Sequence, residues 1–142
     1  MNNYSQIENK YLRKGHVIKK AERKNALSYV SDFIKKRIIQ TPILKRQNLK
    51  NFSFNTLHHL VSIKDLNEIR LRLFNEINKD KKFRNNFFLI AKNTLFSIVG
   101  NELAMQNKIN LSIQFPNDDS SLLPLHSDTW DGDSPFESVL WL

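Results

Sequence analysis

The chain of 142 residues carries 22 Lys and Arg against 14 Asp and Glu, and it contains no cysteine. This length suits one domain with a core of its own, while the lack of cysteine excludes a disulfide framework, a thiolate zinc site and a cysteine nucleophile. The sequence has no apolar run of about eighteen residues that would predict a membrane span, and its polar N-terminus is unlike a signal peptide, so it favours a cytoplasmic protein without a membrane partner.

The first forty residues predict a short strand and then a helix. His16-Val17-Ile18, which follows Gly15, is expected to form the strand. Residues 21–40 place apolar side chains at helical spacing, and Thr41-Pro42 should end this helix because proline pushes the preceding residue out of the α region. The apolar positions of the helix are Ala26, Leu27, Val30, Phe33, Ile34 and Ile38.

Two further helices are expected between residues 62 and 100, after a loop at 43–61 that contains a short helix near residues 56–60. Ser62 is a candidate N-cap with Asp65 three residues later, and the helix that it opens should run to about residue 78. The next helix is expected at 82–99, with Gly100 as its C-terminal cap. The inward positions are Leu66, Ile69, Leu73 and Ile77 in the first helix, and Phe87, Ile90, Ala91, Leu95 and Ile98 in the second.

Beyond residue 108 the spacing of the apolar residues changes from helical to alternating. Residues 110–115 alternate polar and apolar side chains, which predicts a half-buried strand. A loop is expected at 116–121, a turn at 131–135 and a further strand at 136–142. The expected fold class is therefore α+β. It is a single domain, 1–142, in which a mainly helical part at 1–108 packs on the first strands of a sheet at 109–142.

His126 and Asp128 are the candidate metal ligands of the chain. If residues 122–128 are extended, side chains two positions apart point to the same face, so an imidazole and a carboxylate would project together. Two histidines and one carboxylate are the usual ligands of non-haem Fe(II) in oxygenases. A histidine hydrogen-bonded to a nearby carboxylate in a loop is the alternative interpretation of the same triplet.

The residues around this pair carry a resemblance to a known family. Residues 123–137 read LPLHSDTWDGDSPFE, and the chain then runs to a Leu-Trp pair. This run resembles Fe(II)- and 2-oxoglutarate-dependent oxygenases of the sporadic-carbohydrate-cluster type, distant relatives of the phytanoyl-CoA hydroxylase group. The likeness is strong over 122–142, thin over 11–40, where Gly15-His16-Val17-Ile18 looks like the family's opening strand, and negligible between them.

The resemblance implies an oxidoreductase, a dioxygenase built on a double-stranded β-helix (jelly roll) with flanking helices. His126 and Asp128 would be two iron ligands, and Fe(II), 2-oxoglutarate and O2 would act on a carbohydrate-related or other small-molecule substrate, with the protein positioning the cofactor and excluding water. Gln114 is a candidate for binding 2-oxoglutarate, or else an ordinary solvent-facing strand residue. Trp130 and Trp141 are candidates for the substrate pocket, or else ordinary core residues.

Two parts of the family's site are missing from the sequence. The family order places a second histidine, and a basic residue that grips 2-oxoglutarate, downstream of Asp128. The fourteen residues after Asp128 include no His, Arg or Lys, and His16, His58 and His59 all precede the motif. The chain is therefore interpreted as a truncated N-terminal portion of a longer oxygenase, inactive as it stands.

Two other interpretations stay open. The first fifty residues carry 13 Lys and Arg against 3 Asp and Glu, which is compatible with a non-enzymatic module that binds nucleic acid or an anionic surface. No known nucleic-acid motif supports that module, and solvated helix faces explain the same charge. The remaining interpretation is a decayed relic of the oxygenase family that has no present activity.

Overall fold

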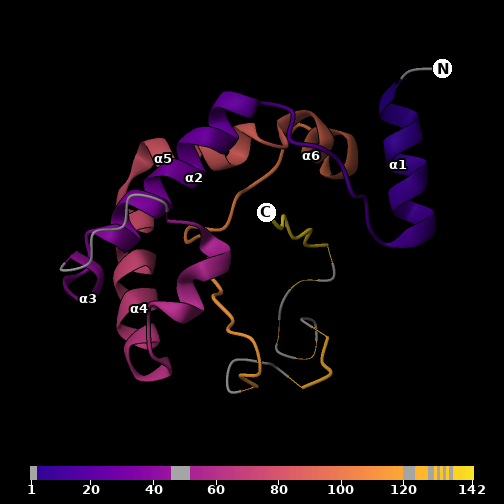
Figure 1. Ribbon diagram of the computed structural model, residues 1–142. Coiled ribbons are helices and arrows are strands. Elements are labelled where there is room, and N and C mark those ends of the chain that lie inside the picture. The colour runs from indigo at the N-terminus through magenta and orange to yellow at the C-terminus, as the bar shows by residue number, and fades with distance from the viewer. Residues whose placement is uncertain are drawn as a thin grey trace.

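The computed structural model describes residues 3–45, 52–119, 124–127, 130, 132, 134 and 136–142, and within them the regular structure is helical. Figure 1 shows α2, α4 and α5 packed together, with α1 standing apart from them beside α6. The elements in chain order are α1 (Asn3–Lys14), α2 (Lys24–Ile39), α3 (Pro42–Lys45), the 3-10 helix η1 (Phe54–His59), α4 (Ile63–Lys79), α5 (Lys81–Leu89) and α6 (Lys92–Val99).

Two clusters of buried side chains form the core of the helical part. One lies where α2 meets α5, the other where the end of α2 meets α4, and Ile34 and Leu111 pack against both. Each fully buried Leu, Ile or Phe stabilises the fold by about 1.5–3 kcal/mol, so these clusters hold the helices together. The first consists of Ala26, Val30, Ile77, Phe83, Ile90 and Ile109, and the second of Ile38, Leu44, Leu57, Val61, Ile69 and Leu73.

Three predicted helices are confirmed, together with the predicted stop of one and the predicted N-cap of another. The helix expected at 21–40 is α2, and buried Thr41 ends it by donating both its N–H (3.0 Å) and its hydroxyl (2.7 Å) to the Ile38 carbonyl oxygen. The short helix near residues 56–60 is η1. The cap at Ser62 also forms, because Ser62 Oγ accepts from the Asp65 N–H at 3.3 Å and donates to Asp65 Oδ2 at 2.6 Å. All four inward residues expected in α4 are buried.

The single helix predicted at 82–99 is wrong, because the chain divides it into α5 and α6 at Ile90 and Ala91. Ala91 leaves the helical region, with φ −135° and ψ 19°. Glu22 holds this break from a distant part of the chain. The Glu22 N–H donates to the Ile90 carbonyl oxygen at 2.9 Å, and the Glu22 carboxylate accepts hydrogen bonds from backbone N–H groups in the first turn of α6. Gly100 follows α6 with a positive φ of 91°, as the sequence predicted.

Helix α1 was not predicted, and the strand expected at 16–18 is wrong. Gly15 ends α1 with φ 70°, and its N–H donates to the Tyr11 carbonyl at 2.7 Å, which is a left-handed C-terminal cap. Residues 16–21 then form an extended connection rather than a strand, with Ile18 83% exposed. A strand forms only when a neighbouring strand pairs with its backbone N–H and carbonyl groups. The described structure pairs no strand with residues 16–21, so the apolar residues at 16–18 do not form one.

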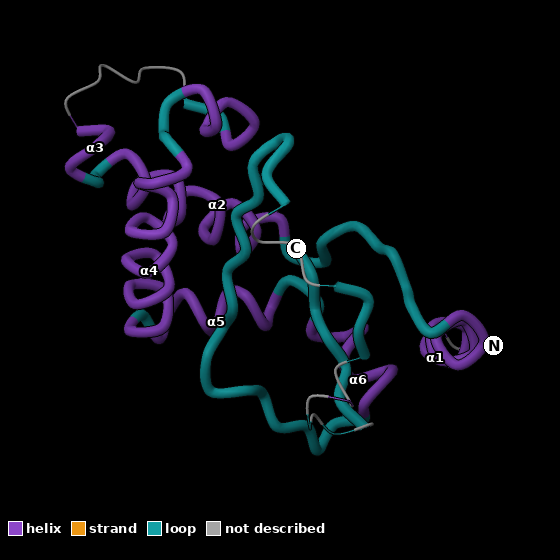
Figure 2. The backbone as a smooth tube through the Cα atoms, turned by 90° about the horizontal axis from the view of Figure 1, so that it is seen from below, coloured by secondary structure: helices purple, strands orange, loops and turns teal. Residues whose placement is uncertain are grey.

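The expected α+β fold class is also wrong for the described part of the chain. Residues 109–119 and 136–142 contain no strand, so the first strands of a jelly roll expected at 109–142 are not formed by the residues that the structure describes there. The alternation of 110–115 is nevertheless real: Leu111, Ile113 and Phe115 pack against the helical core, while Ser112 and Gln114 are exposed. Figure 2 shows this stretch as part of the long connection that follows α6 past the helices.

Side chains of α4 and α5 take the place of a neighbouring strand. Asn78 Nδ2 donates to the Ile109 carbonyl at 3.0 Å, and the Ile109 N–H donates to Asn78 Oδ1 at 2.7 Å. Arg84 donates to the carbonyl oxygens of Met105 (2.8 Å) and Asn107 (2.7 Å). Buried backbone groups need hydrogen-bond partners, and here helix side chains supply them. The alternation of polar and apolar residues at 110–115 therefore predicted correctly which side chains are buried, but not that helices, rather than a sheet, cover them.

The described C-terminal residues return towards α1, where the Tyr11 hydroxyl and Ser138 Oγ are hydrogen-bonded at 3.1 Å. Among the helices that the structure describes, none has the length and apolar character to cross a bilayer.

Candidate functional site

His126 lies in the described part of the chain, whereas Asp128 lies outside the described residues, and so does the geometry of the pair. The His126 side chain is exposed, and its Nδ1 is 2.7 Å from the carbonyl oxygen of Pro124. Because a carbonyl oxygen can only accept, Nδ1 carries the proton in this contact, and Nε2 carries the lone pair of the neutral ring. Histidines that bind metals are commonly oriented in this way by a backbone carbonyl.

The other histidines do not gather around His126 in the described structure. His16 makes the same local contact, with Nδ1 3.0 Å from the Lys14 carbonyl, so the contact alone does not single out His126. His58 and His59 lie together at the end of η1 with ring centres 3.8 Å apart. Among the described residues no three His, Asp or Glu side chains form a group that could hold a metal ion.

The three other candidate residues lie on the surface. Gln114 is exposed between the partly buried Ile113 and Phe115, on the side of the extended segment that faces away from the core. Trp130 is 75% exposed and Trp141 is 81% exposed. Neither tryptophan belongs to a buried cluster, and neither lines the cavities described next.

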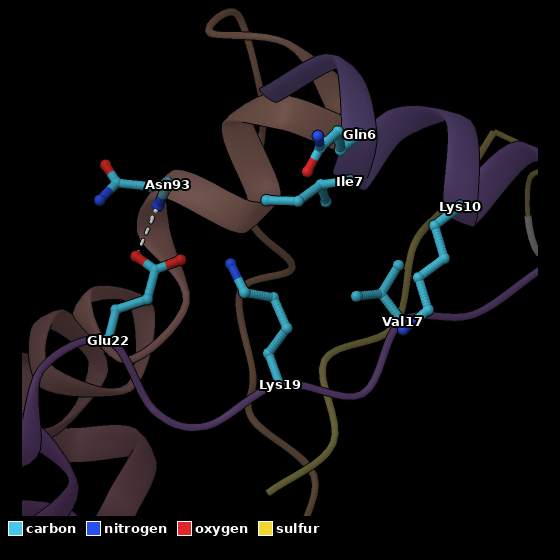
Figure 3. A pocket seen from close by; sticks show the side chains of 7 residues that line it. All are labelled: Gln6, Ile7, Lys10, Val17, Lys19, Glu22 and Asn93. Atoms are coloured by element: carbon cyan, nitrogen blue, oxygen red, sulfur yellow. Dashed lines mark hydrogen bonds between the residues drawn. The ribbon is translucent and has the colours of Figure 1, made fainter. Parts of the chain in front are cut away.

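Two adjoining cavities form a groove along α1. The larger, about 590 Å³, lies between α1, the connection at 15–22 and the start of α6. In Figure 3, Lys19 reaches from the connection towards α6, and Lys10 reaches from α1 towards Val17. The smaller, about 500 Å³, shares Gln6 and Lys10 with the larger. We call this surface the α1 groove; its polar side chains are Gln6, Asn9, Lys10, Arg13, Lys19 and Asn93.

Glu22 is a carboxylate in the lining of the α1 groove, and α6 engages its charge. Its Oε2 accepts from the Asn93 N–H at 2.9 Å, and its Oε1 accepts from the Thr94 N–H at 2.8 Å and from Thr94 Oγ1 at 2.6 Å. Partial burial acts to raise the Glu22 pKa, but these hydrogen bonds and the charge of Lys19 outweigh it and hold the pKa below its ordinary value of 4.5. Glu22 is therefore ionised at neutral pH, and its negative charge is stabilised by the N-terminus of α6.

The sequence did not lead us to predict a functional role for the residues of the α1 groove, because we assigned no helix or strand to the polar N-terminus. A signal was present there. Ile7 and Tyr11 are four residues apart, with Lys10 and Arg13 on an adjoining face, and Gly15 follows as a stop. That pattern is typical of a short amphipathic helix with a basic last turn.

Comparisons with protein-family models, with curated proteins and with solved structures found no match. Any function therefore has to be argued from the residues of this chain.

Proposed function

We propose that this chain supplies two iron ligands, His126 and Asp128, to an Fe(II)- and 2-oxoglutarate-dependent dioxygenase that oxidises a carbohydrate-related or other small-molecule substrate. The observation that carries the proposal is the run at 123–137, where the H-x-D triplet is followed by Trp130 and then by G-D-S-P-F. An isolated H-x-D triplet arises easily by chance, and the longer run is far more specific. The proposal requires a third iron ligand and a 2-oxoglutarate anchor besides these two residues.

The local geometry of His126 fits the role of a ligand. With Nδ1 donating to the Pro124 carbonyl, a neutral His126 ring would carry its lone pair on Nε2, the nitrogen that would then bind the metal. The bound iron and 2-oxoglutarate would supply the oxidative chemistry. This chain's part in it is to hold the metal and to orient it.

Apolar side chains near His126 and in the C-terminal residues add support for a binding role. Leu125 is 97% exposed, Phe136 is 89% exposed, and both tryptophans are exposed as well. Contiguous exposed apolar surface often marks a binding site, and these side chains would supply such a surface if the proposed site brings them together. The segment that carries the motif thus presents the apolar groups that an organic substrate would contact.

Succinate production tests the proposal in the longest protein product that contains these 142 residues. With Fe(II), 2-oxoglutarate and O2 present, the wild-type protein should convert 2-oxoglutarate to succinate. His126→Ala and Asp128→Asn should each lower the rate by more than about a hundredfold, because loss of a direct ligand exceeds the 10–100-fold cost of losing a ligand's supporting partner. His16→Ala is the matched control, since His16 makes the same local hydrogen bond, and it should keep the wild-type rate.

Wild-type turnover by His126→Ala would contradict the assignment of the ligand. If the wild-type protein forms no succinate, the interpretation as a relic is supported instead.

A further inference from the structure

We infer that the α1 groove binds the phosphate group of a small phosphorylated organic molecule. This inference is independent of the proposed iron site. It rests on two adjoining cavities whose described linings include three cations from two different segments of the chain: Lys10 lines both, Lys19 lines the larger and Arg13 lines the smaller.

The cations and amides of α1 lie on one stripe of the helix. Gln6, Asn9, Lys10 and Arg13 follow the i, i+3, i+4, i+7 spacing that places side chains on a single helix face. Glu8 is two residues from Gln6, about 200° around the helix at 3.6 residues per turn, so its carboxylate is on the opposite side. The stripe therefore presents donors without a competing carboxylate from α1.

These donors match the chemistry of a phosphate ester. Arg13 offers a planar fork of N–H groups that can bind two phosphate oxygens at once, and Lys10 adds a mobile point charge beside it. From the other side, Lys19 Nζ donates to Thr94 Oγ1 at 3.1 Å, which holds its ammonium group at the groove.

Glu22 offsets only part of this positive field, through its attraction to Lys19. Its oxygens already accept three hydrogen bonds from Asn93 and Thr94, and the N-terminus of α6 offsets its charge. The described linings of the two cavities thus contain three cations and one carboxylate, and most lone pairs of that carboxylate already accept hydrogen bonds. An anion is the ligand that such a groove favours.

The floor of the larger cavity argues for an organic phosphate of modest size. Ile7 and Val17 line it and are half-buried, so they offer apolar surface next to the cations. A volume of about 590 Å³ falls within the roughly 300–1,000 Å³ of typical small-molecule sites. No aromatic side chain is present in the described lining to stack on bases, which disfavours single-stranded nucleic acid.

Calorimetric titration of the 142-residue chain with phenyl phosphate and with inorganic phosphate tests the inference. Phenyl phosphate should bind about tenfold more tightly, because its ring can cover Ile7 and Val17, and tenfold corresponds to about 1.4 kcal/mol of apolar contact. The double variant K10Q/R13Q should weaken phenyl phosphate binding by at least about tenfold, as expected for losing charge-assisted hydrogen bonds.

The matched control is K20Q/K24Q, which removes the same charge from exposed residues that do not belong to the described lining and should leave binding unchanged. No binding of phenyl phosphate by the wild-type chain would overturn the inference. So would equal weakening by the two double variants, since that would reveal a general effect of net charge. Salt-sensitive binding of a single-stranded oligonucleotide that is unaffected by K10Q/R13Q, with no selective phenyl phosphate binding, would also overturn it.

Discussion

Glu22 links two parts of the chain about seventy residues apart in sequence, and its charge makes that link dependent on pH. The lowered Glu22 pKa means that the folded state holds this proton less tightly than the unfolded state does. The stabilisation is therefore fully present above the ordinary value of 4.5 and is lost as the pH falls through the lowered folded value.

Glu22→Gln keeps an oxygen that can accept hydrogen bonds but removes the charge. At pH 7 the variant should unfold with a free energy lower by about 0.3–1 kcal/mol, the usual size of a charge effect at a helix N-terminus. The gap to wild type should close as the pH falls below 4.5. Urea unfolding at several pH values measures this, with Glu8→Gln, an exposed carboxylate on α1, as the control. Parallel pH profiles for wild type and Glu22→Gln would contradict this role.

At the scale of elements, the segment at 105–115 shows how helices can anchor an extended chain without a sheet. Asn78→Ala should lower the free energy of unfolding by about 1–3 kcal/mol, because the Ile109 N–H and carbonyl lose their partner. Asn75→Ala, an exposed position on the same helix, is the matched control. Urea unfolding gives both values, and the Ile109 amide should exchange faster with solvent in Asn78→Ala. Equal stability of the two variants would show that the Asn78 hydrogen bonds do not anchor this segment.

The sequence predicted those elements whose signals are local. Helical spacing, the Ser62 cap and the stop at Thr41-Pro42 identified α2 and α4, with the four inward residues of α4 all buried. The break between α5 and α6 was missed because Glu22, which holds it, is distant in sequence. The strand predicted at 110–115 was wrong, because alternating polar and apolar residues indicate only that one face of an extended segment is buried. Helices can cover that face as well as a sheet can. His126 was proposed from its motif, whereas the α1 groove depends on a tertiary contact that no local pattern encodes.

At the scale of the whole molecule, charge divides the chain. The first fifty residues hold 13 Lys and Arg against 3 Asp and Glu, and residues 101–142 hold 1 against 7. The proposed anion-binding groove lies in the basic part and the proposed metal ligands in the acidic part. The proposed phosphate ligand is thus assigned to the basic part of the chain and the proposed metal cation to the acidic part, as electrostatic attraction favours.

The central claim is that His126 and Asp128 bind a divalent cation together. NMR of the isotope-labelled 142-residue chain during titration with Mn(II), whose unpaired electrons broaden nearby signals, tests it most directly. We expect the amides around residues 124–130 to broaden first, and we expect this broadening to disappear in both His126→Ala and Asp128→Asn. Broadening centred on His58 and His59, or unchanged by Asp128→Asn, would contradict the claim.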